Sequence, residues 1–367
     1  MLRASEPWNS LFAPTEAEGE MASRELRVIY KSGDALLALP GSTRAALACL
    51  SLYPAQTARA RLARGLLSFL IRFRVRTGMR PTRLELARRA PFTRFLSEVA
   101  GETGEQLPEF GILAGNPRSP GQRFMILVCA GSGQPSAVIK AGMSKEARSL
   151  ILKESTFLKE AGGRAPGIPV LRKQFEDSRI GALALDYYPG ESPRETCAVE
   201  MTRLLSQWVD TTSTIQIEES GMWRQLKTCP SAKGELTGIE SKLAGKRVHP
   251  VIFHGDFAPW NIRVQPSREW MVLDWERGER VGLPGWDWFH FVIQSAILVK
   301  KAGIEELIRL VEALLASDAF KAYAQKALIQ GSERELLIAY LLHIADVIQP
   351  SEGLEQTRAL LNRLKAG

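Results

Sequence analysis

The sequence predicts an α+β fold in which a strand-rich region precedes a mainly helical one. Between residues 106 and 188, short apolar runs bounded by turn residues indicate β-strands with one helix among them. From residue 193 onward, apolar residues recur at helical spacing. Residues 1–105 precede both regions and indicate a hairpin with helices. We therefore expect an accessory α/β region at 1–105, an antiparallel sheet lobe at 106–188 and a helical lobe at 189–367.

Size and composition are those of a globular protein with more than one domain. The chain has 367 residues, of which 45% are hydrophobic and 24% charged. It has no apolar run of the ~18–20 residues that span a bilayer, and its start lacks the basic and apolar segments of a secretory signal. The four cysteines lie far apart without a CxxC pair, which argues against a zinc site or a disulfide framework. We expect reduced thiols and a cytoplasmic location.

The accessory region is expected to begin with a loose polar arm at 1–22. Two apolar runs, 26–30 and 35–39, flank Ser32-Gly33-Asp34 and predict a strand, a turn and a second strand. Three helices complete the region, and they are expected after Ser42, from Thr57 to about Arg76, and near Thr82–Val99.

The second of these helices belongs to a strongly basic stretch. Between Arg59 and Arg94 there are eleven arginines, and Glu85 is the only acidic residue. This charge fits an anionic partner or a membrane surface, and it also fits a solvated helix face whose apolar stripe packs on the next domain. The stripe consists of Leu62, Leu66, Phe69, Leu70 and Phe73, and the basic residues elsewhere on the wheel are Arg61, Arg64, Arg72 and Arg76.

The sheet lobe is predicted from two hairpins, a helix and two further strands. The helix follows Ser144, a residue suited to capping its N-terminus, and ends at Gly162. Glu154 falls on the apolar stripe of this helix, four residues after Leu150 and four before Leu158. A glutamate on a buried face needs a partner, because an unpaired buried charge is very costly. The expected strands are 110–113, 123–128, 137–140, 168–175 and 180–187.

The helical lobe contains a stretch in which three polar residues stand at the ends of short strands. Asp256 follows the run Val251–Phe253, Asn261 precedes Ile262–Val264, and Asp274 follows Met271–Leu273. Hard cations take oxygen ligands, and Mg²⁺ commonly uses one or two carboxylates together with substrate phosphates. These residues therefore suggest a phosphotransferase. Helices are expected around this stretch at about 194–217, 235–245, 286–301, 303–315 and 333–348.

The same motifs resemble the aminoglycoside phosphotransferase and choline kinase family, which has the two-lobed protein-kinase-like fold. His254-Gly255-Asp256, Asn261 five residues later and Asp274 thirteen beyond that follow the family's catalytic order. Val138-Ile139-Lys140 resembles the strand with the nucleotide-binding lysine, and 183–190 resembles the segment between the lobes. The resemblance covers about 106–350 and leaves 1–105 outside it.

The resemblance implies a role for each matching residue in transfer of phosphate from ATP. Asp256 would accept the proton of the attacking hydroxyl or orient that hydroxyl. Asn261 and Asp274 would hold Mg²⁺, while Lys140 would contact the α- and β-phosphates with Glu154 as its ion-pair partner. Backbone groups around the segment Asp186, Tyr187 and Tyr188 would bind the adenine edge.

Three nearby residues receive structural roles instead. We expect His254 to brace the catalytic loop by hydrogen bonds and Asp287 to cap or brace a helix start. For Glu276, a second metal ion and a surface role are both kept open.

The remaining expectations concern the phosphate-covering loop, the nucleotide, the acceptor and one alternative function. The loop 114–122 lacks a GxGxxG pattern, although Gly115, Asn116 and Ser119 offer donors for phosphate. ATP is expected, and GTP is not excluded. The acceptor is a hydroxyl of a sugar, an amino-alcohol or an aminoglycoside-like molecule, and the net charge of +8 favours a neutral or anionic one. The alternative is an inactive pseudokinase that recognises an anionic partner through 1–105, and the oligomeric state is not predicted.

Overall fold

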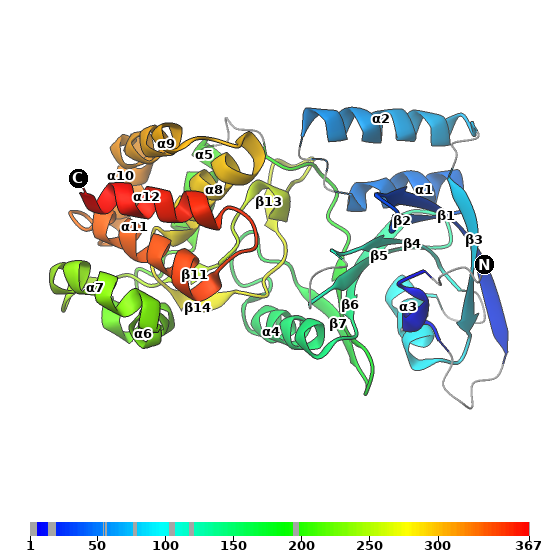
Figure 1. Ribbon diagram of the computed structural model, residues 1–367. Coiled ribbons are helices and arrows are strands. Elements are labelled where there is room, and N and C mark those ends of the chain that lie inside the picture. Colours follow the sequence, from blue (N-terminus) through cyan, green and yellow to red (C-terminus); the bar gives the residue numbers. More distant parts are fainter. Residues whose placement is uncertain are drawn as a thin grey trace. The chain divides into compact units, whose positions relative to one another are not determined.

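The computed structural model describes residues 6–13, 20–53, 55, 57–75, 79–102, 107–116, 121–193 and 198–366 (Figure 1). The chain forms two compact units. Unit 1 comprises Met1–Lys159 and Pro169–Tyr188, and unit 2 comprises Glu160–Ile168 and Pro189–Gly367. Unit 1 is built on an antiparallel sheet and unit 2 is mainly helical, which confirms the predicted α+β fold class. Among the described residues, no helix is long and apolar enough to cross a membrane.

Unit 1 contains one eight-stranded sheet in the order β3-β1-β2-β4-β5-β6-β8-β7. Every neighbouring pair is antiparallel. Strand β2 pairs with β4, so the N-terminal hairpin and the predicted sheet lobe share one sheet. The predicted separation at residue 105 is therefore corrected: residues on both sides of it belong to one unit. The strands are β1 (Met21–Lys31), β2 (Asp34–Pro40), β3 (Arg80–Ala87), β4 (Glu109–Ala114), β5 (Arg123–Cys129), β6 (Pro135–Gly142), β7 (Leu171–Glu176) and β8 (Gly181–Asp186).

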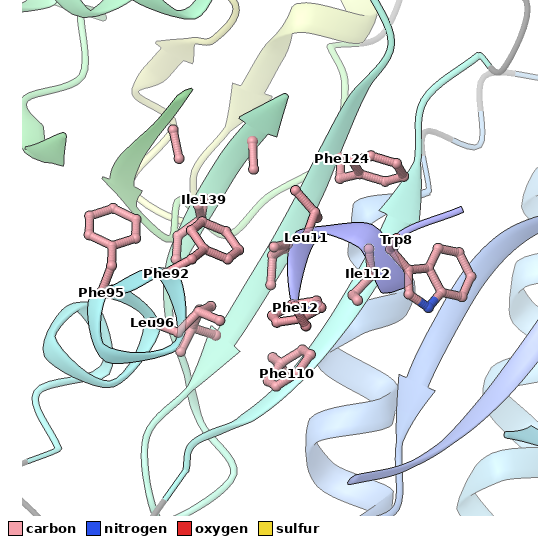
Figure 2. Close-up of a cluster of buried hydrophobic side chains, with 14 of the residues drawn as sticks. Trp8, Leu11, Phe12, Phe92, Phe95, Leu96, Phe110, Ile112, Phe124 and Ile139 are labelled. Atoms are coloured by element: carbon pink, nitrogen blue, oxygen red, sulfur yellow. The ribbon is translucent and has the colours of Figure 1, made fainter. Parts of the chain in front are cut away.

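The central strands of this sheet are buried on both faces, and successive side chains of a strand point to opposite faces. On β5, Ile126 and Val128 enter one core cluster while Leu127 enters the other. The first cluster is covered by helix α3 (Pro91–Ala100) and the short 3₁₀ helix Asn9–Leu11, as Figure 2 shows. The second is covered by helices α1 (Thr43–Cys49) and α2 (Ala58–Arg72). The sheet thus lies between two helical layers.

Two predictions for the N-terminal region are wrong. One helix was expected near Thr82–Val99, and its second part is present as helix α3. Its first part is instead strand β3, in which Leu84 and Leu86 are buried while Arg83 and Glu85 are exposed. That alternation has the period of a strand. The arm was expected to be loose, yet Trp8, Leu11 and Phe12 are buried in the first cluster, where the Phe12 ring stacks on Phe110 (Figure 2).

The predicted helix starts are confirmed where the capping residues could be identified. Ser42 accepts a hydrogen bond from the N–H of Ala45, and the Ser144 hydroxyl accepts one from Ala147 at the start of helix α4 (Lys145–Ala161). Arg76, the loop residues 117–120 and Cys197 lie outside the described residues. The other three cysteines form no disulfide.

Unit 2 consists of helices around three short two-stranded sheets. The pairs are β9 (Ile215–Gln216) with β10 (Arg247–Val248), β11 (Val251–Phe253) with β14 (Glu279–Gly282), and β12 (Ile262–Val264) with β13 (Trp270–Val272). Helices α6, α10 and α12 were not predicted, and π-helical turns at Ser295–Lys300 and His343–Ile348 continue α8 and α11. The helices are α5 (Ala198–Gln207), α6 (Gly221–Thr228), α7 (Pro230–Leu243), α8 (Trp286–Gln294), α9 (Ile304–Ala316), α10 (Asp318–Lys326), α11 (Glu333–Leu342) and α12 (Leu354–Ala366).

Candidate active site

The predicted ion pair of unit 1 is present. Lys140 on β6 and Glu154 on α4 meet with Nζ 2.5 Å from Oε2. Their side chains are 7% and 0% exposed, so the pair is shielded from solvent. The sequence places Glu154 on the inner face of α4, and β6 brings Lys140 to it. A lysine fixed in this way presents a directed positive charge that suits phosphate oxygens.

The segment at the end of β8, where backbone groups were expected to bind an adenine edge, already uses one of its backbone donors within the sheet. The Asp186 carboxylate is exposed and pairs with Arg172, with Oδ1 3.2 Å from Nη1. The backbone N–H of Tyr187 donates to the carbonyl of Ser136 at 3.0 Å, so the sheet already uses this donor. Burial raises the pKa of the Tyr188 hydroxyl. Tyr187 N–H is therefore removed from the groups expected to bind an adenine edge.

In unit 2, the loop after β11 is held by the imidazole of His254. The side chain is fully buried, and this burial lowers its pKa to about 4. The neutral ring accepts at Nδ1 from the N–H of Asp256 at 3.1 Å and donates from Nε2 to the carbonyl of Leu273 at 2.9 Å. Both ring nitrogens are thus used to hold backbone, as predicted for a bracing residue.

Asp287 holds the same loop from the first turn of α8. Its two carboxylate oxygens accept the N–H groups of His254 and Gly255 at 2.8 and 3.1 Å. Burial raises the pKa of Asp287 to about 7, and the two backbone donors oppose this shift. Gly255 has φ of 81°, and a Cβ on it would lie 2.7 Å from Cβ of Arg277. Only glycine fits this turn without strain.

Asp256, the predicted catalytic residue, is held at both carboxylate oxygens. His290 Nε2 lies 3.0 Å from Oδ1, and Asn261 Nδ2 lies 2.8 Å from Oδ2. Burial raises the pKa of Asp256, but the hydrogen bond and charge of His290 outweigh it and leave the pKa below its usual value. The side chain is still 32% exposed. Asp256 is therefore an oriented, ionised carboxylate that solvent can reach.

The predicted metal ligands are adjacent through the β12–β13 pairing. Ile262 pairs with Val272, which brings the next residues, Asn261 and Leu273, together, and Leu273 N–H donates to the Asn261 carbonyl at 2.7 Å. Asp274 follows with φ of 72°, a left-handed conformation that is uncommon outside glycine and concentrates at functional sites. The sheet register thus places both predicted ligands at one end of the hairpin.

The side-chain oxygens of Asn261 and Asp274 suit a magnesium ion that is also bound by phosphates. The Asn261 amide nitrogen donates to Asp256, so its Oδ1 would face a cation. Together with the Asp274 carboxylate, this supplies two hard oxygen ligands. Within the described ranges, no group of three or more His, Cys, Asp or Glu side chains is placed to hold a metal by itself. The residues fit Mg²⁺ bound with a nucleotide better than a metal enclosed entirely by protein.

Two residues of this site were missed from the sequence. His290 on α8 contacts Asp256, and Tyr340 on α11 contacts His290, with the hydroxyl 3.1 Å from Nδ1. His290 stands three residues after Asp287, so both lie on one helix face. That spacing was a usable signal for His290. Tyr340 offered none, because it lies within an apolar run.

Comparisons with known proteins were made by sequence and by structure. No family model and no curated protein matches the chain. Among solved structures, a thermostable mutant of the aminoglycoside phosphotransferase APH(4)-Ia with ADP and hygromycin B is similar at 13% identity and a TM-score of 0.44, over 75% of this chain and 96% of that one. The macrolide 2'-phosphotransferase MphH of Brachybacterium faecium is similar at 17% identity and a TM-score of 0.42, over 68% and 92%.

The choline kinase LicA of Streptococcus pneumoniae is also similar, at 15% identity and a TM-score of 0.38, over 66% of this chain and 90% of that one.

Proposed function

We propose that this protein is an ATP- and Mg²⁺-dependent phosphotransferase that acts on a hydroxyl group of a small molecule. The observation that carries the proposal is the environment of Asp256. Its ionised carboxylate is fixed by His290 and Asn261, keeps a solvent-accessible side, and stands next to the oxygen ligands of Asn261 and Asp274. Such a carboxylate can orient a hydroxyl beside metal-bound phosphate.

The low pKa of Asp256 limits its part in the chemistry. An ionised carboxylate with a lowered pKa is a weak base, so it first orients the hydroxyl by accepting its hydrogen bond. As the acceptor oxygen bonds to the γ-phosphorus and the bond to the bridging oxygen breaks, the hydroxyl becomes acidic and its proton passes to Asp256. ADP carries away the electrons of the broken bond.

The remaining predicted residues receive binding roles in this proposal. Lys140, held by Glu154, contacts the α- and β-phosphates. Bound Mg²⁺ would neutralise charge on the phosphates, and Asn261 and Asp274 would hold it. The backbone around Asp186 and Tyr188 contacts the base, with Tyr187 N–H excluded as a donor.

We propose an order of preference among acceptors from the net charge of the chain. The chain carries a net charge of +8, which favours neutral or anionic acceptors such as sugars over polycationic aminoglycosides. A screen of sugars, amino-alcohols and aminoglycosides with ATP or GTP, read out as phosphorylated acceptor, tests this. The proposal predicts Mg²⁺-dependent product that disappears in Asp256→Ala. Nucleotide binding without product from any acceptor would instead support the pseudokinase alternative.

A further inference from the structure

The outer face of helix α2 carries an apolar stripe that the described part of the chain leaves exposed. Its residues recur at helical spacing, and at 3.6 residues per turn they form one line along the helix. They are Leu62, Leu66, Phe69 and Phe73, which are 77%, 60%, 56% and 61% exposed. The rings of Phe69 and Phe73 pack on each other, with centroids 4.5 Å apart. We call these four residues the outer stripe.

The outer stripe is distinct from the face that attaches α2 to unit 1. Ile71 is buried and Leu67 is partly buried, and both pack into the second core cluster beside α1. These two positions lie on the side of the helix opposite the outer stripe. Figure 1 shows α2 outside α1, at the surface of this unit. Helix α2 is thus apolar on two faces, and only one of them serves the core.

Positive charge flanks the outer stripe on both sides. Arg59 lies along one flank, and Arg61 and Arg72 lie along the other, all of them exposed. Arg74, directly after the helix, is exposed as well. No aspartate or glutamate occurs from Arg59 to Leu84. An apolar strip bordered by cations on a helix is the arrangement of segments that lie in a membrane interface.

We propose that helix α2 binds the surface of a membrane containing anionic lipids, with the outer stripe in the acyl boundary and the flanking arginines at the headgroups. Transfer of leucine and phenylalanine side chains from water to the acyl region is favourable in free energy. The arginines beside them are attracted electrostatically to anionic headgroups when they lie within a Debye length of the surface. The helix lies flat, because its inner face remains attached to the core.

The charge pattern selects this occupant over two others. A nucleic acid or another dissolved polyanion would pair with the arginines but would give the four apolar side chains no apolar environment. A second copy of the chain would cover the apolar side chains but would bring the same arginines together, and like charges repel. Of these three occupants, only an anionic lipid surface complements both features.

Vesicle flotation of the full chain tests the proposal. We expect wild type to partition onto vesicles that contain phosphatidylglycerol and phosphatidylcholine, and more weakly onto phosphatidylcholine alone. The double variant Leu66→Ser, Phe69→Ser should weaken partitioning about 100-fold on the mixed vesicles. The double variant Arg59→Gln, Arg72→Gln should weaken it about 20-fold on the mixed vesicles and little on the neutral ones.

The matched control is Leu152→Ser with Val199→Ser, which removes two other exposed apolar side chains from helices α4 and α5. It should partition like wild type. Circular dichroism should show that all variants stay folded, and phosphate transfer to a dissolved acceptor should be unaffected, which separates this test from that of the proposed function.

Three results would overturn the lipid proposal. One is outer-stripe variants that partition like wild type. Another is a protein that does not bind vesicles but self-associates through the outer stripe, as measured by light scattering. The third is an affinity for heparin that equals the affinity for anionic vesicles and is unchanged in the variant Leu66→Ser, Phe69→Ser.

Discussion

His290 Nε2 lies 3.0 Å from Oδ1 of Asp256, and this contact joins helix α8 to the loop after β11. One helical turn earlier, Asp287 accepts the backbone N–H groups of that loop. Helix α8 therefore fixes both the path of the loop and the direction of its carboxylate. Tyr340 contacts the other ring nitrogen of His290 and so limits rotation of the imidazole.

Replacing His290 should move the pH dependence of the reaction. The hydrogen bond and charge of His290 lower the pKa of Asp256 against the effect of burial. In His290→Gln, the pKa should therefore rise, and the acidic limb of the kcat/KM profile should move to higher pH. We expect kcat to fall about 10- to 100-fold from lost orientation. Tyr340→Phe serves as the milder comparison.

A merely structural effect of His290→Gln would lower kcat at all pH values equally. An acidic limb that stays in place, measured with the same acceptor, would contradict the positioning role.

The ion pair of Lys140 and Glu154 predicts unequal effects from its two partners. Lys140→Met should raise the KM for ATP and lower kcat, because it removes the phosphate contact. Glu154→Gln leaves the buried ammonium without the carboxylate, and Lys140→Met leaves the buried carboxylate without the ammonium. Either change should cost about 3–5 kcal/mol of stability, so the unequal effects are those on ATP use. Urea unfolding, together with initial rates over a range of ATP, distinguishes these effects. If Glu154→Gln loses as much ATP affinity as Lys140→Met and unfolds at the same urea concentration as wild type, that result would argue against the buried pair.

Buried histidines make the fold sensitive to acid. Burial lowers the pKa of His343 to about 4, while the unfolded chain keeps an ordinary value near 6.5. Between these values the unfolded state binds more protons, so stability falls as the pH falls. Protonation of His343 in the unfolded chain should by itself lower the free energy of unfolding by about 2 kcal/mol between pH 7 and pH 5. His254 acts in the same direction, whereas the raised pKa of Asp287 opposes it.

The variant His343→Gln keeps a donor for the contact with Gln225 but cannot gain a proton. The free energy of unfolding, measured in urea, should fall between pH 7 and pH 5 in both proteins. The fall should be about 2 kcal/mol smaller in His343→Gln than in wild type. An identical difference in both proteins would show that His343 does not contribute to acid sensitivity.

The N-terminal segment should be essential to unit 1. Trp8 is fully buried in the core cluster of the sheet. Trp8→Ala should destabilise unit 1 by about 3–5 kcal/mol, the usual cost of removing a buried tryptophan. Thermal unfolding measures the effect, and Trp8→Phe should recover most of it. A midpoint unchanged in Trp8→Ala would mean that the arm contributes little to the core.

The sequence was informative where a local pattern carried the signal. Glu154 could be assigned because a charged residue stood on an apolar helical stripe, and the structure pairs it with Lys140, the partner that the family resemblance implied. The strand-end positions of Asp256, Asn261 and Asp274 were likewise readable from apolar runs, and the β12–β13 register explains why the last two are adjacent.

Features that depend on tertiary contacts were not readable in the same way. The contact of Tyr340 with His290 spans 50 positions, and nothing in the apolar sequence of α11 marks it. Trp8, Leu11 and Phe12 were hidden by the polar residues around them. The start of the helix expected near Thr82–Val99 was misassigned, although the two-residue alternation of the buried Leu84 and Leu86 has the period of a strand. The hydrogen bond of Tyr187 to Ser136 follows from strand register, which one sequence does not provide.

Transfer of phosphate by the purified full chain tests the central claim most directly. The measurement is mass-spectrometric detection of a phosphorylated acceptor formed from ATP and Mg²⁺, compared between wild type, Asp256→Asn and Asp274→Ala. We predict product with wild type, a loss of at least about 100-fold in Asp256→Asn, and no product in Asp274→Ala or without Mg²⁺. Product formed equally by all three proteins, or by none with any acceptor, would contradict the proposed function.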